Sequence, residues 1–66
     1  MSTMADKIDK MVEDIQAQVS NGEMTAEQAQ VVLKQLEDVY KQANLAGTEK
    51  AIAGISRAIT FMSKLV

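Results

Sequence analysis

The sequence predicts an all-α fold, a helical hairpin of two to three helices whose second arm is long and can be broken at a glycine. Apolar residues recur every three or four positions along most of the 66 residues, which is the period of an amphipathic helix. The apolar side chains are mainly Ala, Val, Ile, Leu and Met, with one Tyr and one Phe, and this composition favours helices over sheets. The length predicts a single helical domain over residues 1–66, near the lower limit for a self-sufficient core.

The first helical segment is predicted over residues 3–20. Met4, Ile8, Met11, Ile15 and Val19 follow one another at intervals of three and four residues. They therefore form one apolar stripe that can pack against a second helix.

A turn is predicted in the stretch "SNGEMT", which follows the first segment. Asn21 and Gly22 tolerate positive φ angles, which suits the end of a helix. Thr25 can cap the next helix, and Gln28 completes a capping box with it. The turn allows the first two segments to close as an antiparallel hairpin.

The second segment is predicted over residues 26–46 and repeats the apolar pattern. Its stripe consists of Ala29, Val32, Leu33, Leu36, Val39, Tyr40 and Ala43. Gly47 can stop this helix, and Thr48 can cap a third segment over residues 48–66. A continuous helix through Gly47 stays open as an alternative, because glycine there costs only about 1 kcal/mol relative to alanine.

The third segment is apolar over a broad arc. One seam consists of Ile52, Ile55, Ile59, Met62 and Val66, and a neighbouring seam consists of Ala51, Ile55, Ala58, Met62 and Leu65. A helix that is hydrophobic on several sides is usually buried on several sides, whereas a two-helix hairpin covers one of them. Three arrangements fit: a third helix of a closed bundle, a helix lying on a membrane, or packing between identical subunits.

The composition argues against catalysis and against metal or cofactor binding. The chain has no cysteine and no histidine, which excludes disulfides, thiolate metal sites and the commonest ligand for zinc. We therefore expect no enzyme, no catalytic residue, no metal site and no cofactor. The acidic run of Asp6, Asp9, Glu13 and Asp14 alternates with lysines and is interpreted as a solvated helix face.

Charge is unevenly distributed along the chain. The formal net charge of -2 argues against nucleic acid as a partner. Residues 1–24 carry two lysines against five carboxylates, whereas the tail carries Lys50, Arg57 and Lys64 against Glu49 alone. An acidic front and a basic tail can attract each other head to tail between copies, and such a heterologous contact can continue as a helical filament.

The opening "MSTMADKIDKMVEDIQ" mixes charges where a signal peptide has an apolar core, so we expect no cleaved signal peptide. The longest weakly polar stretch, residues 51–66, is too short and too polar for a transmembrane span, and membrane contact is not expected.

Residues 36–65, "LEDVYKQANLAGTEKAIAGISRAITFMSKL", resemble the C-terminal part of the needle or pilus subunits of bacterial type III secretion systems. The residues that carry the resemblance are Tyr40, Asn44, Lys50, Ile52, Ile55 and Ile59. The resemblance implies a helical hairpin that polymerises into a hollow tube for protein export on the bacterial surface, and that small helical chaperones hold before export. Many such subunits have prolines in the turn between their helices, and this chain has none.

The sequence therefore predicts a non-enzymatic, secreted structural subunit that assembles with itself. The predicted subunit interface consists of Leu36, Tyr40, Ile52, Ile55, Ile59, Met62, Leu65 and Val66. Lys50, Arg57 and Lys64 are candidates for facing a channel or the acidic residues of a neighbour. Two alternatives remain: a small helical chaperone or adaptor that binds a partner helix, and a monomeric three-helix module that binds a larger protein.

Overall fold

Three helices make up the part of the chain that the computed structural model describes, residues 2–66. They are α1 (Met4–Ser20), α2 (Ala26–Ala43) and α3 (Glu49–Ser63), and no strand occurs in this part. The prediction of an all-helical chain is confirmed, and the long second arm is broken into two helices.

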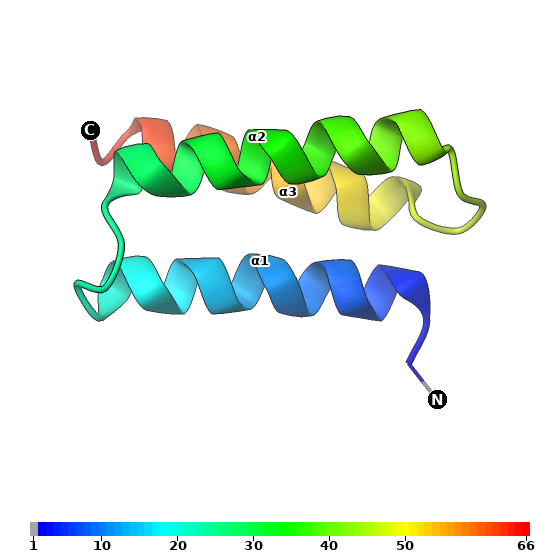
Figure 1. Cartoon of the computed structure of the whole chain (residues 1–66), viewed down its shortest axis with the longest axis horizontal. Helices are drawn as coiled ribbons and strands as arrows, with labels where there is room; N and C mark the ends of the chain where they lie inside the picture. The colour runs from blue at the N-terminus through cyan, green and yellow to red at the C-terminus, as the bar shows by residue number, and fades with distance from the viewer. Residues whose placement is uncertain (1) are drawn as a thin grey trace.

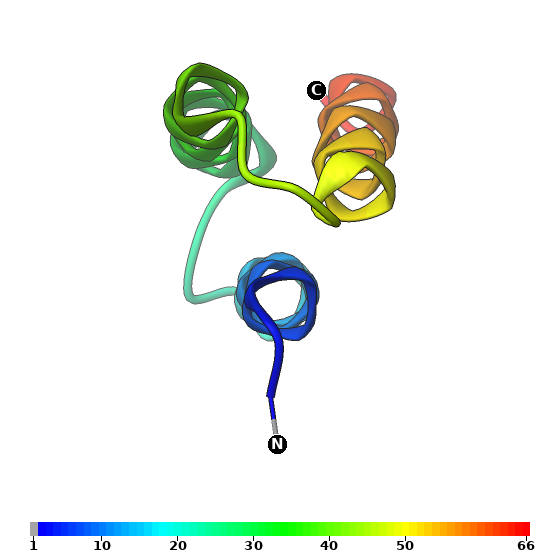
Figure 2. The ribbon, with the colours of Figure 1, turned by 90° about the vertical axis from the view of Figure 1, so that its right-hand side faces the viewer.

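The helices run up, down and up and pack as a compact bundle. In Figure 1, α2 lies above α1, and α3 lies behind α2. Viewed along the bundle, the helices occupy the corners of a triangle (Figure 2). The third helix packs against both α1 and α2. Of the three arrangements open for residues 48–66, the chain adopts the one in which they fold back as the third helix.

One stripe from each helix forms the core. The buried apolar side chains are Ile8, Ile15, Ala29, Leu33, Ala51, Ile55, Ala58 and Met62. Those from α3 belong to the second of its two predicted seams, with spacings of four, three and four residues. The third helix therefore turns this seam inward, against its own chain.

The start of α1 and the turn into α2 are held by local hydrogen bonds. Thr3 forms a capping box with Asp6, and Thr25 forms the predicted box with Gln28, with N···O distances of 3.0 to 3.1 Å. Gly22 has a φ of 77°, and its N–H donates to the carbonyl of Val19. The N–H of the next residue donates to the carbonyl of Gln18 at 2.8 Å, which completes a Schellman motif.

The loop between α2 and α3 corrects three predictions. The second helix ends at Ala43 rather than residue 46, because Asn44 adopts the left-handed conformation with a φ of 50°. Gly47, with a φ of 83°, makes a corner inside the loop and is not the residue that stops the helix. Thr48 does not cap α3 with its side chain: the buried hydroxyl instead donates to the carbonyl of Leu45 at 2.7 Å.

Leu33 provides a test of the core. Its side chain is fully buried, so Leu33→Ala should lower the free energy of unfolding by about 2–5 kcal/mol through lost burial and a cavity. Val31→Ala, on the exposed side of the same helix, is the matched control and should change it by less than about 0.5 kcal/mol. Urea denaturation followed by circular dichroism measures both. Equal effects would contradict the assignment of Leu33 to the core.

The two glycines that are not in the α2–α3 loop should respond in opposite ways to alanine. Gly22→Ala should destabilise the protein by about 1 kcal/mol, because alanine is strained at positive φ. Gly54→Ala should stabilise it by up to about 1 kcal/mol, since this glycine lies inside α3 and an added Cβ meets only the Arg57 guanidinium at 3.6 Å. Thermal unfolding compares the two variants, and a loss of stability in both would contradict the placement of Gly54.

Candidate interaction surface

Among residues 2–66, no three His, Cys, Asp or Glu side chains gather into a group that could hold a metal ion. Thr48 is the buried polar residue of this part, and its hydroxyl is engaged by Leu45. The outer faces of the bundle, in contrast, carry exposed apolar and basic side chains.

The predicted interface residues divide into three groups. Ile55 and Met62 lie in the core of their own chain, so in this fold they cannot contact a second copy. A second group is half-buried and packs beside the core or borders the α2–α3 loop. It consists of Leu36, Tyr40, Ile52 and Ile59. Leu65 and Val66 are exposed, at the end of the chain. Much of the broad apolar arc of α3 is thus covered by α1 and α2 of the same chain.

Lys50, Arg57 and Lys64 are exposed on or next to α3. The ion pairs found within residues 2–66 are Lys10 with Asp14 at 3.4 Å and Lys41 with Glu37 at 3.7 Å. The three basic groups therefore have no carboxylate within 4 Å in the described chain and are available to an acidic partner.

Exposed apolar side chains gather at the C-terminal end. Phe61 is 52% exposed, and Leu65 and Val66 are also exposed. Phe61 and Leu65 border an open groove whose other wall is the end of α1, at Gln16 and Val19. We call Phe61, Leu65 and Val66 the C-terminal patch. Sequence reasoning did not select Phe61, although its position outside both apolar seams of α3 was a signal of exposure.

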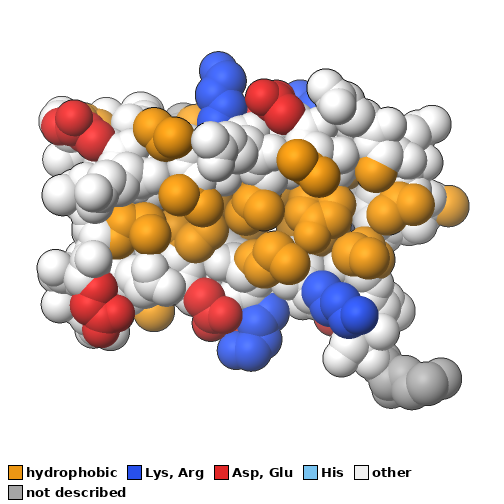
Figure 3. Space-filling view, in the orientation of Figure 1, with side chains coloured by type: hydrophobic (Ala, Val, Ile, Leu, Met, Phe, Trp, Pro, Cys, Tyr) orange, Lys and Arg blue, Asp and Glu red, His pale blue; other side chains and the backbone are white. Residues whose placement is uncertain are grey.

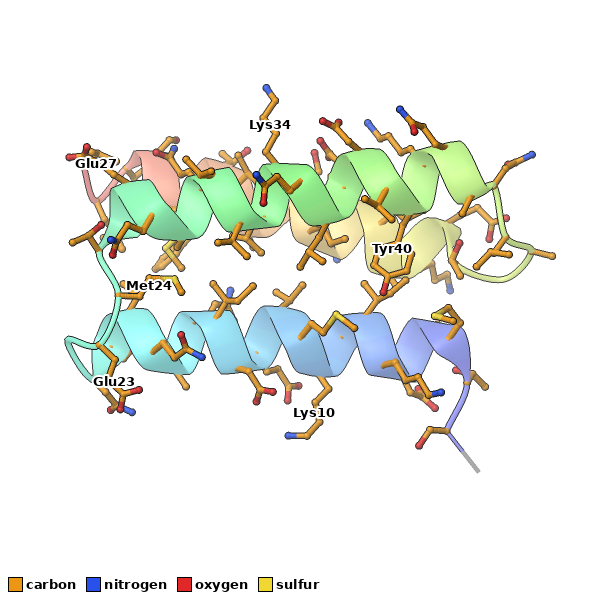
Figure 4. The ribbon with its side chains drawn as sticks, in the orientation of Figure 1. Lys10, Glu23, Met24, Glu27, Lys34 and Tyr40 are labelled. Atoms are coloured by element: carbon orange, nitrogen blue, oxygen red, sulfur yellow. The ribbon has the colours of Figure 1, made fainter. Side chains whose placement is uncertain are left out.

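A second apolar region lies on the face formed by α1 and α2. The space-filling view shows a band of hydrophobic side chains along the junction of the two helices, with charged side chains near the edges (Figure 3). Tyr40 points from α2 toward α1, where its hydroxyl lies 3.8 Å from the sulfur of Met11 (Figure 4). Since α3 lies on the rear side of the α1–α2 pair, no third helix covers the front of this face.

The outer side of α2 extends this open face. Val31 and Val39 are each 59% exposed, and Val31 borders a shallow groove with Met24, Gln28 and Val32. The prediction that Val39 belongs to the inward stripe is wrong, because the core stripe of α2 is narrow and centres on Ala29 and Leu33. Sequence reasoning also missed Val31, a β-branched apolar residue on the side of the helix away from that stripe.

None of the helices within residues 2–66 is both long and apolar enough to cross a membrane. Comparison with protein-family models, with curated proteins and with solved structures found no match to this chain.

Proposed function

We propose that this protein is a non-enzymatic helical subunit that acts by associating with other protein chains, and first with copies of itself. The observation that carries the proposal is the exposure of large apolar side chains on two separate faces of a very small domain. These faces are the open side of α1 and α2 and the C-terminal patch. Exposed apolar surface of this kind is typical of protein–protein contacts. Association also stabilises the folded state, and a small core contributes little stability of its own.

The more specific form of the proposal is a needle or pilus subunit of a bacterial type III secretion system. It is supported by the resemblance of residues 36–65 and by the exposed basic groups of the tail, which can meet the acidic side chains of α1 in a neighbour. In this form the protein is exported to the bacterial surface after contact with small helical chaperones. The filament contact would use the C-terminal patch together with the accessible parts of Ile52 and Ile59.

A chaperone or adaptor is the second candidate. The observation that favours it is the burial of Ile55 and Met62 within the chain. A protein whose core is complete in the monomer can bind a partner on its surface without changing its fold. Such a protein would form a complex of fixed size and would not grow into filaments.

The mass distribution of the purified protein tests the proposal and separates its two forms. Analytical ultracentrifugation over a range of protein concentrations should reveal association that increases with concentration. Open-ended growth supports the needle subunit, and a defined oligomer supports the adaptor. A monomer at every concentration would contradict self-association.

Phe61→Asp tests the role of the C-terminal patch. A carboxylate buried between subunits is strongly unfavourable, so this variant should stop open-ended growth while leaving the helical circular dichroism unchanged. Ser56→Asp, at another exposed position of the same helix, is the matched control and should assemble normally. Undiminished growth of the Phe61 variant would show that filaments do not use the patch.

A further inference from the structure

The exposed side of α2 has a symmetric pattern of residues. Gln28, Val31, Gln35, Val39 and Gln42 follow one another at intervals of three, four, four and three residues, and all of them are exposed. We call these residues the neutral strip. The order of residue types and the order of spacings are the same when read from either end, with Gln35 at the centre.

The neutral strip carries no charged group. The charged residues between its ends are Lys34, Glu37, Asp38 and Lys41. Lys34 points away from α1, at the outer edge of the bundle (Figure 4). At a rise of about 1.5 Å per residue, the strip extends for roughly 20 Å, nearly the whole length of α2.

We infer that the neutral strip forms a second contact between copies of this chain, in which two copies are related by a twofold axis at Gln35 and their α2 helices are antiparallel. The inference rests on the proposed self-association and adds a twofold contact on α2 to the filament contact proposed for the C-terminal patch. In this arrangement Gln35 meets Gln35 of the second copy, Val31 meets Val39, and Gln28 meets Gln42. A twofold contact is isologous, so it requires a surface that complements itself.

The residue types of the neutral strip suit pairing with themselves. A glutamine amide offers both donors and an acceptor, so two facing glutamines can exchange hydrogen bonds. Gln28 already accepts a hydrogen bond from the N–H of Thr25 at 3.0 Å through its carbonyl oxygen, which leaves its amide hydrogens for Gln42 of the second copy. Between these polar pairs, Val31 and Val39 bury apolar surface that is open to solvent in the single chain.

Electrostatics favours a second copy over an unrelated partner at this surface. Two copies carry the same formal net charge of -2 and therefore repel one another. The repulsion is weakest when the surfaces in contact carry no charged groups. Charged side chains at the edges of this face can stay hydrated (Figure 3). In the antiparallel arrangement the two α2 dipoles also point in opposite directions, which is the favourable orientation for helices that lie side by side. A foreign helix would gain nothing from the symmetry of the strip.

The twofold axis predicts which engineered cysteines can pair, and the native chain contains none that would interfere. Packed helices bring facing Cα atoms close enough for a disulfide, which needs about 4.4–6.8 Å. Gln35→Cys should therefore form a disulfide-linked dimer under mild oxidation at least about tenfold faster than the Lys34→Cys control. A mixture of Gln28→Cys and Gln42→Cys proteins should form mixed dimers faster than either protein links to itself.

A charge exchange tests the same register without cysteines. Val39→Glu alone should weaken the dimer at least tenfold, because a carboxylate then replaces an apolar contact. Adding Val31→Lys should restore most of the affinity, since each lysine would face a glutamate of the other copy, whereas within one chain these positions are more than two helical turns apart.

The outcomes separate this inference from the proposed function. Association of the native protein, with equal cross-linking of the Gln35 and Lys34 variants and no rescue by the second charge, would overturn the neutral strip as the contact and leave self-association standing. A native protein that stays monomeric would overturn both. Rapid cross-linking at Gln35 together with the charge rescue would support the twofold contact.

Discussion

The fold depends on the burial of one seam of α3 in the groove between α1 and α2. Ala51, Ile55, Ala58 and Met62 fill this groove, and Ile8 and Leu33 close it from the other helices. Without α3, the first two helices would have only each other, and their inward stripes would be open along one side. The position of α3 also determines which faces remain for partners, because it covers the back of the α1–α2 pair and leaves the front open.

Much of the local structure could be predicted from short sequence signals. The box of Thr25 with Gln28 and the positive φ of Gly22 follow from residue types at fixed positions, and both occur. The end of α2 was harder, because Asn44 and Gly47 can both adopt positive φ and both do. Thr48 was predicted to cap α3, but its side chain is buried and its hydroxyl donates to the carbonyl of Leu45 in the loop.

The period of the apolar residues in α3 could not show which surface buries them. A broad arc is expected for a helix between subunits, and equally for a helix with two neighbours in its own chain. The bundle provides two neighbours, so Ile55 and Met62 are satisfied internally, and the surface left for other chains lies elsewhere. Met4, Met11 and Val39 lie on the predicted stripes and are nevertheless exposed. Self-association now depends on outer faces of a finished bundle rather than on an uncovered third helix.

Amide hydrogen exchange on a dilute, monomeric sample tests this account most directly. If α3 belongs to the cooperative core, the amides of Ile55, Ala58 and Leu33 should open with the same free energy, equal to that of global unfolding. Amides of α3 that exchange much faster than those of α2, and gain protection only at concentrations where the protein assembles, would contradict it. In that case α3 would be held by other subunits and not by its own chain.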